Sequence, residues 1–363
     1  MEKSTIAVKS LEEYKKRLDA ELERYFALKI SEAKRIDPQA VRTIEILRRF
    51  TLSAGKRIRP ALTYYGYLAA GGKDVQELVK TSMAIELVHI FLLVHDDIID
   101  RDEKRHGIET VHETYKKWGK ELGLSDAEAG HFGNSMAIVA GDAAYLLANE
   151  ILYRSNFKAE IIVATLEKTQ EVAYRTTQGQ MMDVLVGAKG TATEKEIVGI
   201  QENKTARYTF EGPLHLGATL AGKKDDQELL TTFSAYALPV GKAFQMRDDI
   251  LGIFGDEKKL GKAVGADIIE GKQTLLIAKA LERGSREQKI QIGKLLGKKD
   301  LSLPELEIFR KIIRDTGSLE YSESLSAQLI AEALEALGKM QFENEDARNF
   351  LEGIAEYIIK REV

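Results

Sequence analysis

Residues 90–100 read Ile90-Phe91-Leu92-Leu93-Val94-His95-Asp96-Asp97-Ile98-Ile99-Asp100, an apolar run that ends in three aspartates. The apolar residues predict a helix over 78–99, and Asp96 and Asp100 share one of its faces because they are four residues apart. Like charges at that spacing destabilise a helix by about 0.2–0.5 kcal/mol, and partial burial raises the cost. A hard divalent cation would offset it, and Mg²⁺ commonly binds between carboxylates and substrate phosphates. This segment therefore indicates a magnesium site.

A second apolar segment ends in the same way. Residues 244–252 read FQMRDDILG and place Asp248 and Asp249 late in a helix predicted over 226–253. Helix bundles build metal sites from facing helices, so the two segments together predict a cavity lined by carboxylates. The alternative for either segment is a solvated helix end, which is our interpretation of the Asp225-Asp226 pair in the polar turn GKKDDQE. The repetition of the pattern in two apolar helices favours the cavity.

The rest of the chain has the 3.6-residue period of helices. Only five prolines occur in 363 residues, where ordinary usage of about 5% predicts roughly eighteen. We expect helix starts at Pro38 and Pro60, one helix over 194–220, and loops over 101–134 and 254–273. The predicted fold is all-α: a single large helical bundle over residues 1–363, with a motif-bearing core at about 40–290 and a helical tail at 291–363.

Composition excludes several classes of function. The chain has no cysteine, so disulfides, zinc–thiolate sites and thiol nucleophiles are excluded, and a cytoplasmic location is expected. A net charge of −4 and a pI near 6.0 disfavour a nucleic-acid partner. The start of the chain has no apolar signal segment, and no run approaches 18 apolar residues, so we expect no stable membrane insertion.

Basic residues indicate the ligand that the metal would share. Residues 55–60, GKRIRP, place Lys56, Arg57 and Arg59 just before a predicted helix start, an arrangement suited to phosphate. Arg105 follows the first aspartates, Lys204 and Arg207 lie one turn apart with Thr205 between them, and Lys262 and Lys272 stand in the second loop. Metal-bearing carboxylates surrounded by cations indicate a diphosphate held from two sides, with electrostatic catalysis.

His89 lies seven residues before Asp96, which is within 20° of two full helical turns, so His89, Leu92 and Asp96 share a stripe. A lone helix histidine is commonly a core residue, and a ligand contact is the alternative that the stripe keeps open.

Together these motifs resemble the trans-isoprenyl diphosphate synthases, the polyprenyl synthetase family, and most of all a short-chain geranylgeranyl diphosphate synthase. The resemblance runs from about residue 40 to about 290. GKRIRP is similar to that family's basic motif, DDIID to its first aspartate-rich motif, and FQMRDD to its second. The Gln180–Asp183 element, the Lys204-Thr205 pair and the Asp267 to Lys272 segment follow the family's order.

The resemblance implies Mg²⁺-dependent head-to-tail condensation of isopentenyl diphosphate with an allylic diphosphate, with three ions per site. The implied roles fall into four groups: metal ligands Asp96, Asp97, Asp100, Asp248 and Asp249; isopentenyl diphosphate contacts Lys56, Arg59, His89 and His106; allylic diphosphate contacts Arg105, Gln180, Lys204, Lys262 and Lys272; and catalytic residues Lys204, Thr205 and Gln245. It also implies a homodimer.

The sequence departs from the family pattern at three positions. His106 stands where arginine is usual, which puts one isopentenyl diphosphate contact in doubt, since histidine is mostly neutral at pH 7. Glu109 replaces a proline. Gly252 replaces the last aspartate of the second motif, so metal binding there should depend mainly on Asp248.

The residues before Asp96 should set the product length. Phe91 lies five residues upstream, about 7.5 Å along the helix, and Leu92 lies four upstream. In the resembled family one aromatic residue at these positions goes with geranylgeranyl diphosphate, the product we expect; a farnesyl or longer product is the alternative. The competing interpretation is that Phe91 is only a core residue.

Three other functions use similar residues. A head-to-head condensing enzyme or a terpene cyclase also has aspartate-rich helices, but neither needs the second diphosphate site that Lys56 and Arg59 indicate. A non-catalytic regulatory subunit of a heteromeric prenyl synthase would be expected to lose an aspartate motif, and this chain keeps both pairs.

Overall fold

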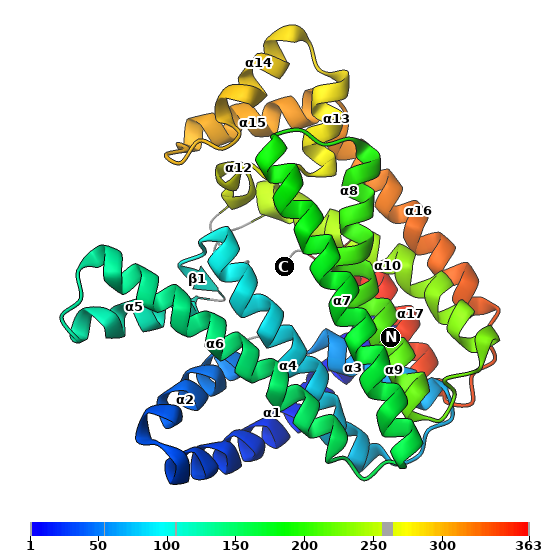
Figure 1. The fold of residues 1–363 in the computed structure, drawn as a ribbon. Helices are drawn as coiled ribbons and strands as arrows, with labels where there is room; N and C mark the ends of the chain where they lie inside the picture. Colours follow the sequence, from blue (N-terminus) through cyan, green and yellow to red (C-terminus); the bar gives the residue numbers. More distant parts are fainter. Residues whose placement is uncertain (1, 54, 106, 256–263, 362–363) are drawn as a thin grey trace.

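The computed structural model describes residues 2–53, 55–105, 107–255 and 264–361. The elements run, in chain order, α1 Lys3–Ile36, α2 Pro38–Ser53, α3 Ile58–Ala69, α4 Val75–Asp100, β1 Lys104–Arg105, β2 Ile108–Glu109, α5 Val111–Glu121, α6 Asp126–Tyr153, α7 Ala159–Lys189, α8 Glu194–Ile200, the π-helix η1 Gln201–Glu211, α9 Gly212–Leu220, α10 Gln227–Phe254, α12 Ala266–Glu270, α13 Leu275–Arg283, α14 Arg286–Leu295, α15 Leu303–Asp315, α16 Ser318–Gly338 and α17 Glu345–Lys360. Across the described residues the strands are limited to β1 and β2, and the all-α prediction is confirmed (Figure 1).

Local signals explain most of the helix boundaries. The backbone N–H of Gln39 donates to the side chain of Asp37 at 2.6 Å, and α2 begins at Pro38 as predicted. The carboxylate of Asp226 accepts from the backbone N–H of Leu229, so the Asp225-Asp226 pair serves as a helix cap. The prediction for Pro60 is wrong, because α3 already begins at Ile58.

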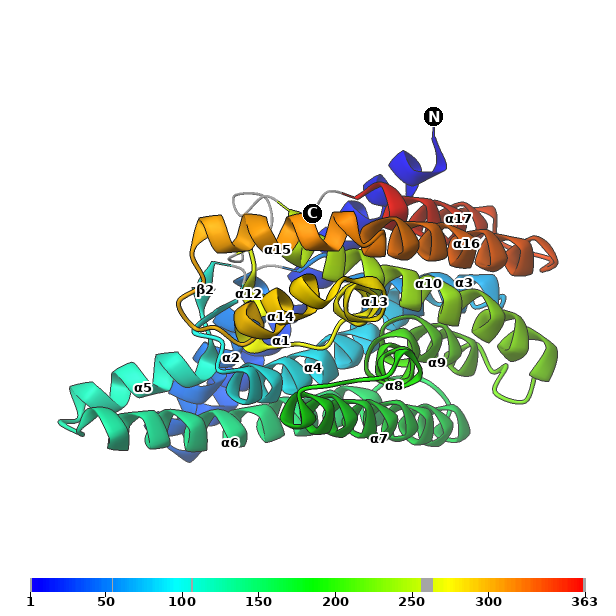
Figure 2. The same ribbon diagram turned by 90° about the horizontal axis from the view of Figure 1, so that it is seen from above.

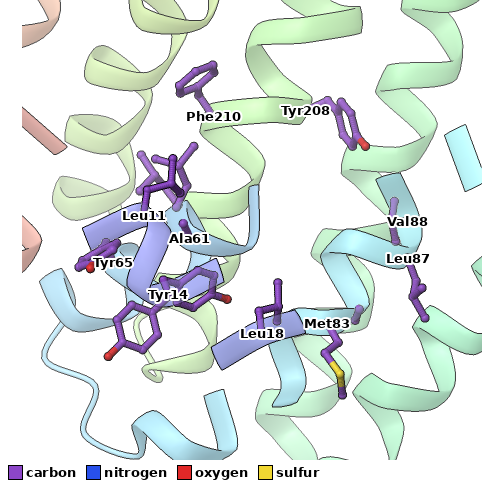
Figure 3. Close-up of a cluster of buried hydrophobic side chains, with 14 of the residues drawn as sticks. Leu11, Tyr14, Leu18, Ala61, Tyr65, Met83, Leu87, Val88, Tyr208 and Phe210 are labelled. Carbon is purple, nitrogen blue, oxygen red and sulfur yellow. The ribbon is translucent and has the colours of Figure 1, made fainter. Parts of the chain in front are cut away.

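The main core gathers α1, α3, α4 and η1 around one set of apolar side chains. Figure 3 shows side chains from these four helices, among them Leu18, Ala61, Leu87 and Phe210, packed in one region. Helices α3 and α9 cross closely, since a Cβ built at Gly217 would lie 2.4 Å from the carbonyl oxygen of Thr63. Tight crossings of this kind hold α4, which carries the first aspartates, in the centre of the bundle.

Helices α12 to α15 pack around a second apolar cluster with the end of α10. Figure 1 shows these helices gathered at one end of the molecule. The cluster includes Ile253, Ile277, Phe309 and Ile313. That residues 1–363 form a single domain stays a prediction.

Two predictions about local structure are wrong. The predicted loop 101–134 contains the antiparallel pair β1–β2, helix α5 and the start of α6. The predicted helix over 194–220 is divided by the π-helix η1. Pro213 has no N–H to bond to the carbonyl of Thr209, which removes one α-helical hydrogen bond just after η1. π-Helical turns are frequent at functional sites, and η1 carries Lys204 and Thr205.

Helices α4 and α6 are long and apolar enough to cross a membrane by length and composition alone. The apolar window of α4 is 67% buried inside the protein, as in a core helix, and that of α6 is 39% buried. Core helices of soluble proteins pass the same test, so the two helices are weak grounds for a membrane span. The expectation of no stable membrane insertion rested on the absence of uninterrupted apolar runs, and these two helices mix apolar and polar residues.

Candidate active site

Asp96 and Asp100 lie on the last turns of α4 and face cations from three other elements. Asp96 Oδ1 accepts a hydrogen bond from Gln180 Nε2 of α7 at 2.8 Å and lies 3.4 Å from Lys204 Nζ of η1. Asp100 Oδ2 lies 3.2 Å from Lys272 Nζ. Burial raises the pKa of Asp96, but the charges of Lys204 and Arg105 outweigh it and hold that pKa below its usual range. Burial and the charge of Asp96 raise the pKa of Asp100.

Asp97 has a different environment from this pair, and its predicted role as a metal ligand stays a prediction. The carboxylate of Asp97 is fully buried and accepts from Arg105 Nε at 2.5 Å, while Arg105 Nη2 reaches Asp102 at 3.1 Å and Asp96 at 4.0 Å. Adjacent helix residues point about 100° apart, so Asp97 turns away from the face of Asp96. Burial raises the pKa of Asp97 to about 7. Asp97 therefore positions Arg105 beside Asp96.

Two lysines connect the elements around the first aspartates. Lys204 donates to Asp183 at 2.6 Å, which joins the Gln180–Asp183 element of α7 to η1. Lys272 lies 2.7 Å from Glu270 and 3.7 Å from Asp267, as well as near Asp100. A Cβ built at Gly252 would lie 2.5 Å from Oδ2 of Asp267. Lys272 thus links the first aspartate motif on α4 to the region of the second on α10.

The second aspartate pair is also divided between two directions. Asp248 pairs with Arg361, the residue that follows α17. Asp249 is buried and accepts from Gln245 Nε2 at 2.9 Å, and Gln245 Oε1 accepts from Thr205 Oγ at 2.8 Å. Burial raises the pKa of Asp249 to about 8. The carboxyl of Asp249 orients the Gln245 amide toward Thr205, and the predicted metal role of Asp249 stays a prediction.

The basic motif places Arg59 against His89 of α4 and Lys56 against Tyr357 of α17. Arg59 Nη1 lies 3.0 Å from His89 Nε2, its Nη2 donates to Thr209 at 2.8 Å, and its guanidinium lies over the ring of Tyr208 at 4.4 Å. Lys56 Nζ donates to the hydroxyl of Tyr357 on α17 at 2.8 Å. His89 thus contacts a cation of the basic motif, and its predicted contact with a ligand stays a prediction.

Arg57, between these residues, has a different environment. Its side chain is buried and donates to Glu86 on α4 at 2.5 Å, to Asp19 on α1 at 2.8 Å and to the carbonyl of Thr51 at 2.6 Å. Its φ of 56° is left-handed, an uncommon conformation for a residue with a side chain. Arg57 therefore anchors the loop that presents Lys56 and Arg59. Glu86, the one acid in the apolar stretch 81–95 of α4, was a sequence signal for this anchor; Tyr208, Tyr357 and Arg361 had none.

The donor set fits magnesium. Asp96 and Asp100 supply carboxylate oxygens, and the buried Oε1 of Gln180 has no hydrogen-bond partner within the described part of the chain. In that part no three histidine or acidic side chains converge on a point that could hold a metal ion. Mg²⁺ sites in proteins commonly use one or two carboxylates together with substrate phosphates and water, and Asp96 and Asp100 are carboxylates of this kind. His106 and Lys262 lie outside the described residues, so their predicted roles stay predictions.

The helical bundle, with aspartates late in α4 and α10 and a basic motif beside them, defines a synthase that acts on diphosphates. The chain belongs to the polyprenyl synthetase family, whose model matches residues 42–313. It is 33% identical over 310 residues to the geranylgeranyl diphosphate synthase of Methanosarcina mazei, covering 85% of this chain and 87% of that protein.

Two further relatives bear on structure and product. A crystal structure of geranylgeranyl pyrophosphate synthase from Corynebacterium glutamicum, complexed with isoprenyl diphosphate and magnesium, matches with a TM-score of 0.90 at 31% identity, covering 97% of this chain and 99% of that one. The geranylfarnesyl diphosphate synthase of Aeropyrum pernix is 30% identical, covering 85% of this chain and 91% of that protein. The chain is a prenyltransferase that elongates a prenyl diphosphate, and the family uses magnesium.

Proposed function

We propose that this enzyme condenses isopentenyl diphosphate with an allylic diphosphate to give geranylgeranyl diphosphate. The observation that carries the proposal is the single aromatic side chain, Phe91, before the first aspartates, with Leu92 beside it. The ring of Phe91 packs against Tyr145 of α6 at a centroid distance of 4.9 Å. An aromatic barrier at this depth limits growth of a chain that extends from Asp96 along α4.

The basic motif binds isopentenyl diphosphate in this proposal. Lys56, Arg59 and His89 contact its diphosphate, with His106 completing the set. In support, contacts with His89, Thr209 and Tyr208 already orient the guanidinium group of Arg59. Orientation before binding reduces the entropy lost on association.

The cations around Asp96 bind the allylic diphosphate. Lys204, Lys272 and Arg105 neutralise the leaving group, aided by Gln180 and Lys262. Three Mg²⁺ ions, held by Asp96, Asp100 and Asp248, would supply further positive charge to the diphosphate. The allylic C–O bond breaks, the double bond of isopentenyl diphosphate attacks the allylic cation, and the departing diphosphate takes the proton that the new chain loses. Thr205 and the Gln245 amide stabilise the cation through their oxygen dipoles.

The test is to incubate the purified chain alone with Mg²⁺, labelled isopentenyl diphosphate and an allylic primer, and to measure the chain length of the product. We expect mainly a twenty-carbon product. A farnesyl product, or the longer product that the Aeropyrum relative's name suggests, would correct the length but not the reaction. No elongation by the chain alone, with elongation restored by a second protein, would instead establish the regulatory subunit.

We also propose a cytoplasmic homodimer. Large apolar side chains are exposed on two neighbouring helices, which lie along one edge of the molecule (Figure 2). They are Ile138, Val139 and Leu146 on α6 and Val163, Tyr174, Met181, Val184 and Leu185 on α7. Many exposed apolar side chains on two neighbouring helices are typical of an interaction site, and a second copy would cover them. Sedimentation equilibrium of the wild type and of Leu146→Glu tests this: we expect a dimer and a monomer, respectively, and a monomeric wild type would contradict the proposal.

A further inference from the structure

We infer that Tyr145 on α6 is a second determinant of product length, acting behind Phe91. The inference rests on the proposed function and adds a residue to it. The sequence patterns singled out residues on the aspartate-bearing helix, whereas Tyr145 belongs to the helix that faces it.

The contact between the two rings is held in place from the side of α4. Phe91 packs edge-on against His95, one turn further along α4, at a centroid distance of 4.9 Å. His95 Nε2 lies 3.2 Å from the carbonyl oxygen of Ile138 on α6. A Cβ built at Gly141, also on α6, would lie 2.5 Å from His95 Nε2. Helices α4 and α6 therefore approach each other closely here. Phe91 is confined between His95 and Tyr145.

Tyr145 is held in place from the side of α7. Its hydroxyl donates to the side-chain oxygen of Gln170, the Gln170 amide donates to Asn149 at 3.1 Å, and the Asn149 amide donates back to the carbonyl of Tyr145 at 2.8 Å. This closed set of hydrogen bonds fixes the ring and joins α6 to α7. Burial raises the pKa of Tyr145, so the hydroxyl remains a donor.

The hydrogen-bonded residues Tyr145, Gln170 and Asn149 lie at a depth along the helices where they could close the far end of the space for the prenyl chain. Gln180 contacts Asp96, and Gln170 lies ten residues earlier on the same helix, about 15 Å along its axis. Phe91 lies about 7.5 Å below Asp96 on α4. The hydrogen bond between Tyr145 and Gln170 thus joins α6 to α7 at least as far from Asp96, along the helix axes, as Phe91 is. A prenyl chain that passes Phe91 next meets the ring of Tyr145.

The experiment compares the products of the full-length enzyme and its variants with one allylic primer at saturating isopentenyl diphosphate. Loss of one apolar contact changes discrimination about tenfold, so Tyr145→Ala should raise the ratio of twenty-five- to twenty-carbon product about tenfold. Tyr145→Ala combined with Phe91→Ala should lengthen the product beyond either single variant. Tyr145→Phe keeps the ring but removes its hydrogen bond to Gln170, so it should lengthen the product less than Tyr145→Ala does. Tyr153→Ala, at an exposed tyrosine on the same helix, is the matched control.

Product length separates this role from a structural one, because a loss of packing lowers the melting temperature without changing product length. Tyr145→Leu replaces Tyr145→Ala if the latter does not fold, and it should also lengthen the product. A folded, active Tyr145→Ala or Tyr145→Leu with the wild-type product distribution would overturn the inference while the proposed function stands. A wild-type enzyme that elongates no primer would overturn both.

Discussion

Gln180 Nε2 donates a hydrogen bond to Asp96 Oδ1 at 2.8 Å, and this bond ties α7 to α4 beside Lys204. Without it the carboxylate of Asp96 could rotate toward Lys204 and Arg105. A misplacement of about 1 Å in a catalytic group can reduce the rate about 100-fold. The bond therefore has a role in orientation that charge alone does not provide.

We predict that Gln180→Leu lowers kcat for prenyl transfer about 100-fold, by releasing Asp96 from its catalytic orientation. Incorporation of labelled isopentenyl diphosphate measures the rate. Gln328→Leu, at an exposed glutamine on α16, is the control and should be close to wild type. A Gln180→Leu rate within twofold of the control would show that Asp96 needs no orientation from α7.

Arg57 gives a prediction about stability. Asp19 still pairs with Arg57 when the charge of Glu86 is removed, so the loss expected is that of one hydrogen bond between charged groups, about 1.5–3 kcal/mol. Glu86→Gln should therefore lower the free energy of unfolding by about that amount, as measured by urea denaturation, and should raise KM for isopentenyl diphosphate, because Arg57 anchors the loop that carries Lys56 and Arg59.

The matched control for this prediction is Arg48→Met, which breaks the surface pair of Arg48 with Glu23. Exposed pairs contribute about 0–1 kcal/mol. Equal losses in the Glu86 and Arg48 variants would argue against a buried anchor. A stability loss without a change in KM would separate the fold from the diphosphate site.

Helical period was sufficient to predict that Asp96 and Asp100 share a face. The clustering of basic residues indicated cations beside them, and these are Lys204 at Asp96 and Lys272 at Asp100. The opposite directions of Asp97 and Asp249 were also within reach, since neighbouring residues on a helix diverge by about 100°. Arg361 and Tyr357 were not within reach. They arrive from α17, far along the chain, and no local pattern indicates which distant helix closes a bundle.

The π-helical course of η1 was equally hidden. Its backbone geometry depends on how Pro213 and the neighbouring helices constrain the segment, whereas the apolar pattern of residues 194–220 suits an uninterrupted α-helix. A Cβ built at Gly241 on α10 would lie 2.4 Å from the Cα of Ala206 in η1. Such tertiary contacts override local helix preference.

His215 gives a prediction about pH. Burial lowers its pKa, an effect that Lys168 reinforces and Glu211 opposes. Its Nε2 donates to the carbonyl of Leu230, on α10. The imidazole of His215 therefore binds its second proton more readily in the unfolded chain than in the folded one. The contribution of neutral His215 to the free energy of unfolding is fully present above the ordinary histidine pKa of about 6.5 and is lost as the pH falls below it.

Thermal unfolding between pH 7.5 and 5 measures this effect. The wild type should lose at most about 1.4 kcal/mol per pH unit through this one residue, and His215→Asn should have a shallower dependence in the same buffers. Identical slopes for the two proteins would show that His215 takes up its proton equally well in the folded and unfolded states.

Gly252 gives the last prediction, at the position where the second motif departs from the family pattern. The carboxylate of Asp267 occupies the space beside Gly252, since a Cβ there would lie 2.5 Å from Asp267 Oδ2. Gly252→Ala should displace that carboxylate from Lys272, which lies 3.7 Å away. This contact is an ion pair too long for a hydrogen bond, and a partly exposed pair contributes about 0–1 kcal/mol, so KM for the allylic diphosphate should rise by at most about fivefold. Gly252→Asp should be worse, because it adds a negative charge beside Asp267 and Asp249.

The control is Gly293→Ala on α14, where a Cβ meets nothing within 4 Å and should leave KM unchanged. If Gly252→Asp instead lowers KM, an aspartate at position 252 helps to bind the allylic diphosphate. Asp267 then does not take the place of the missing aspartate.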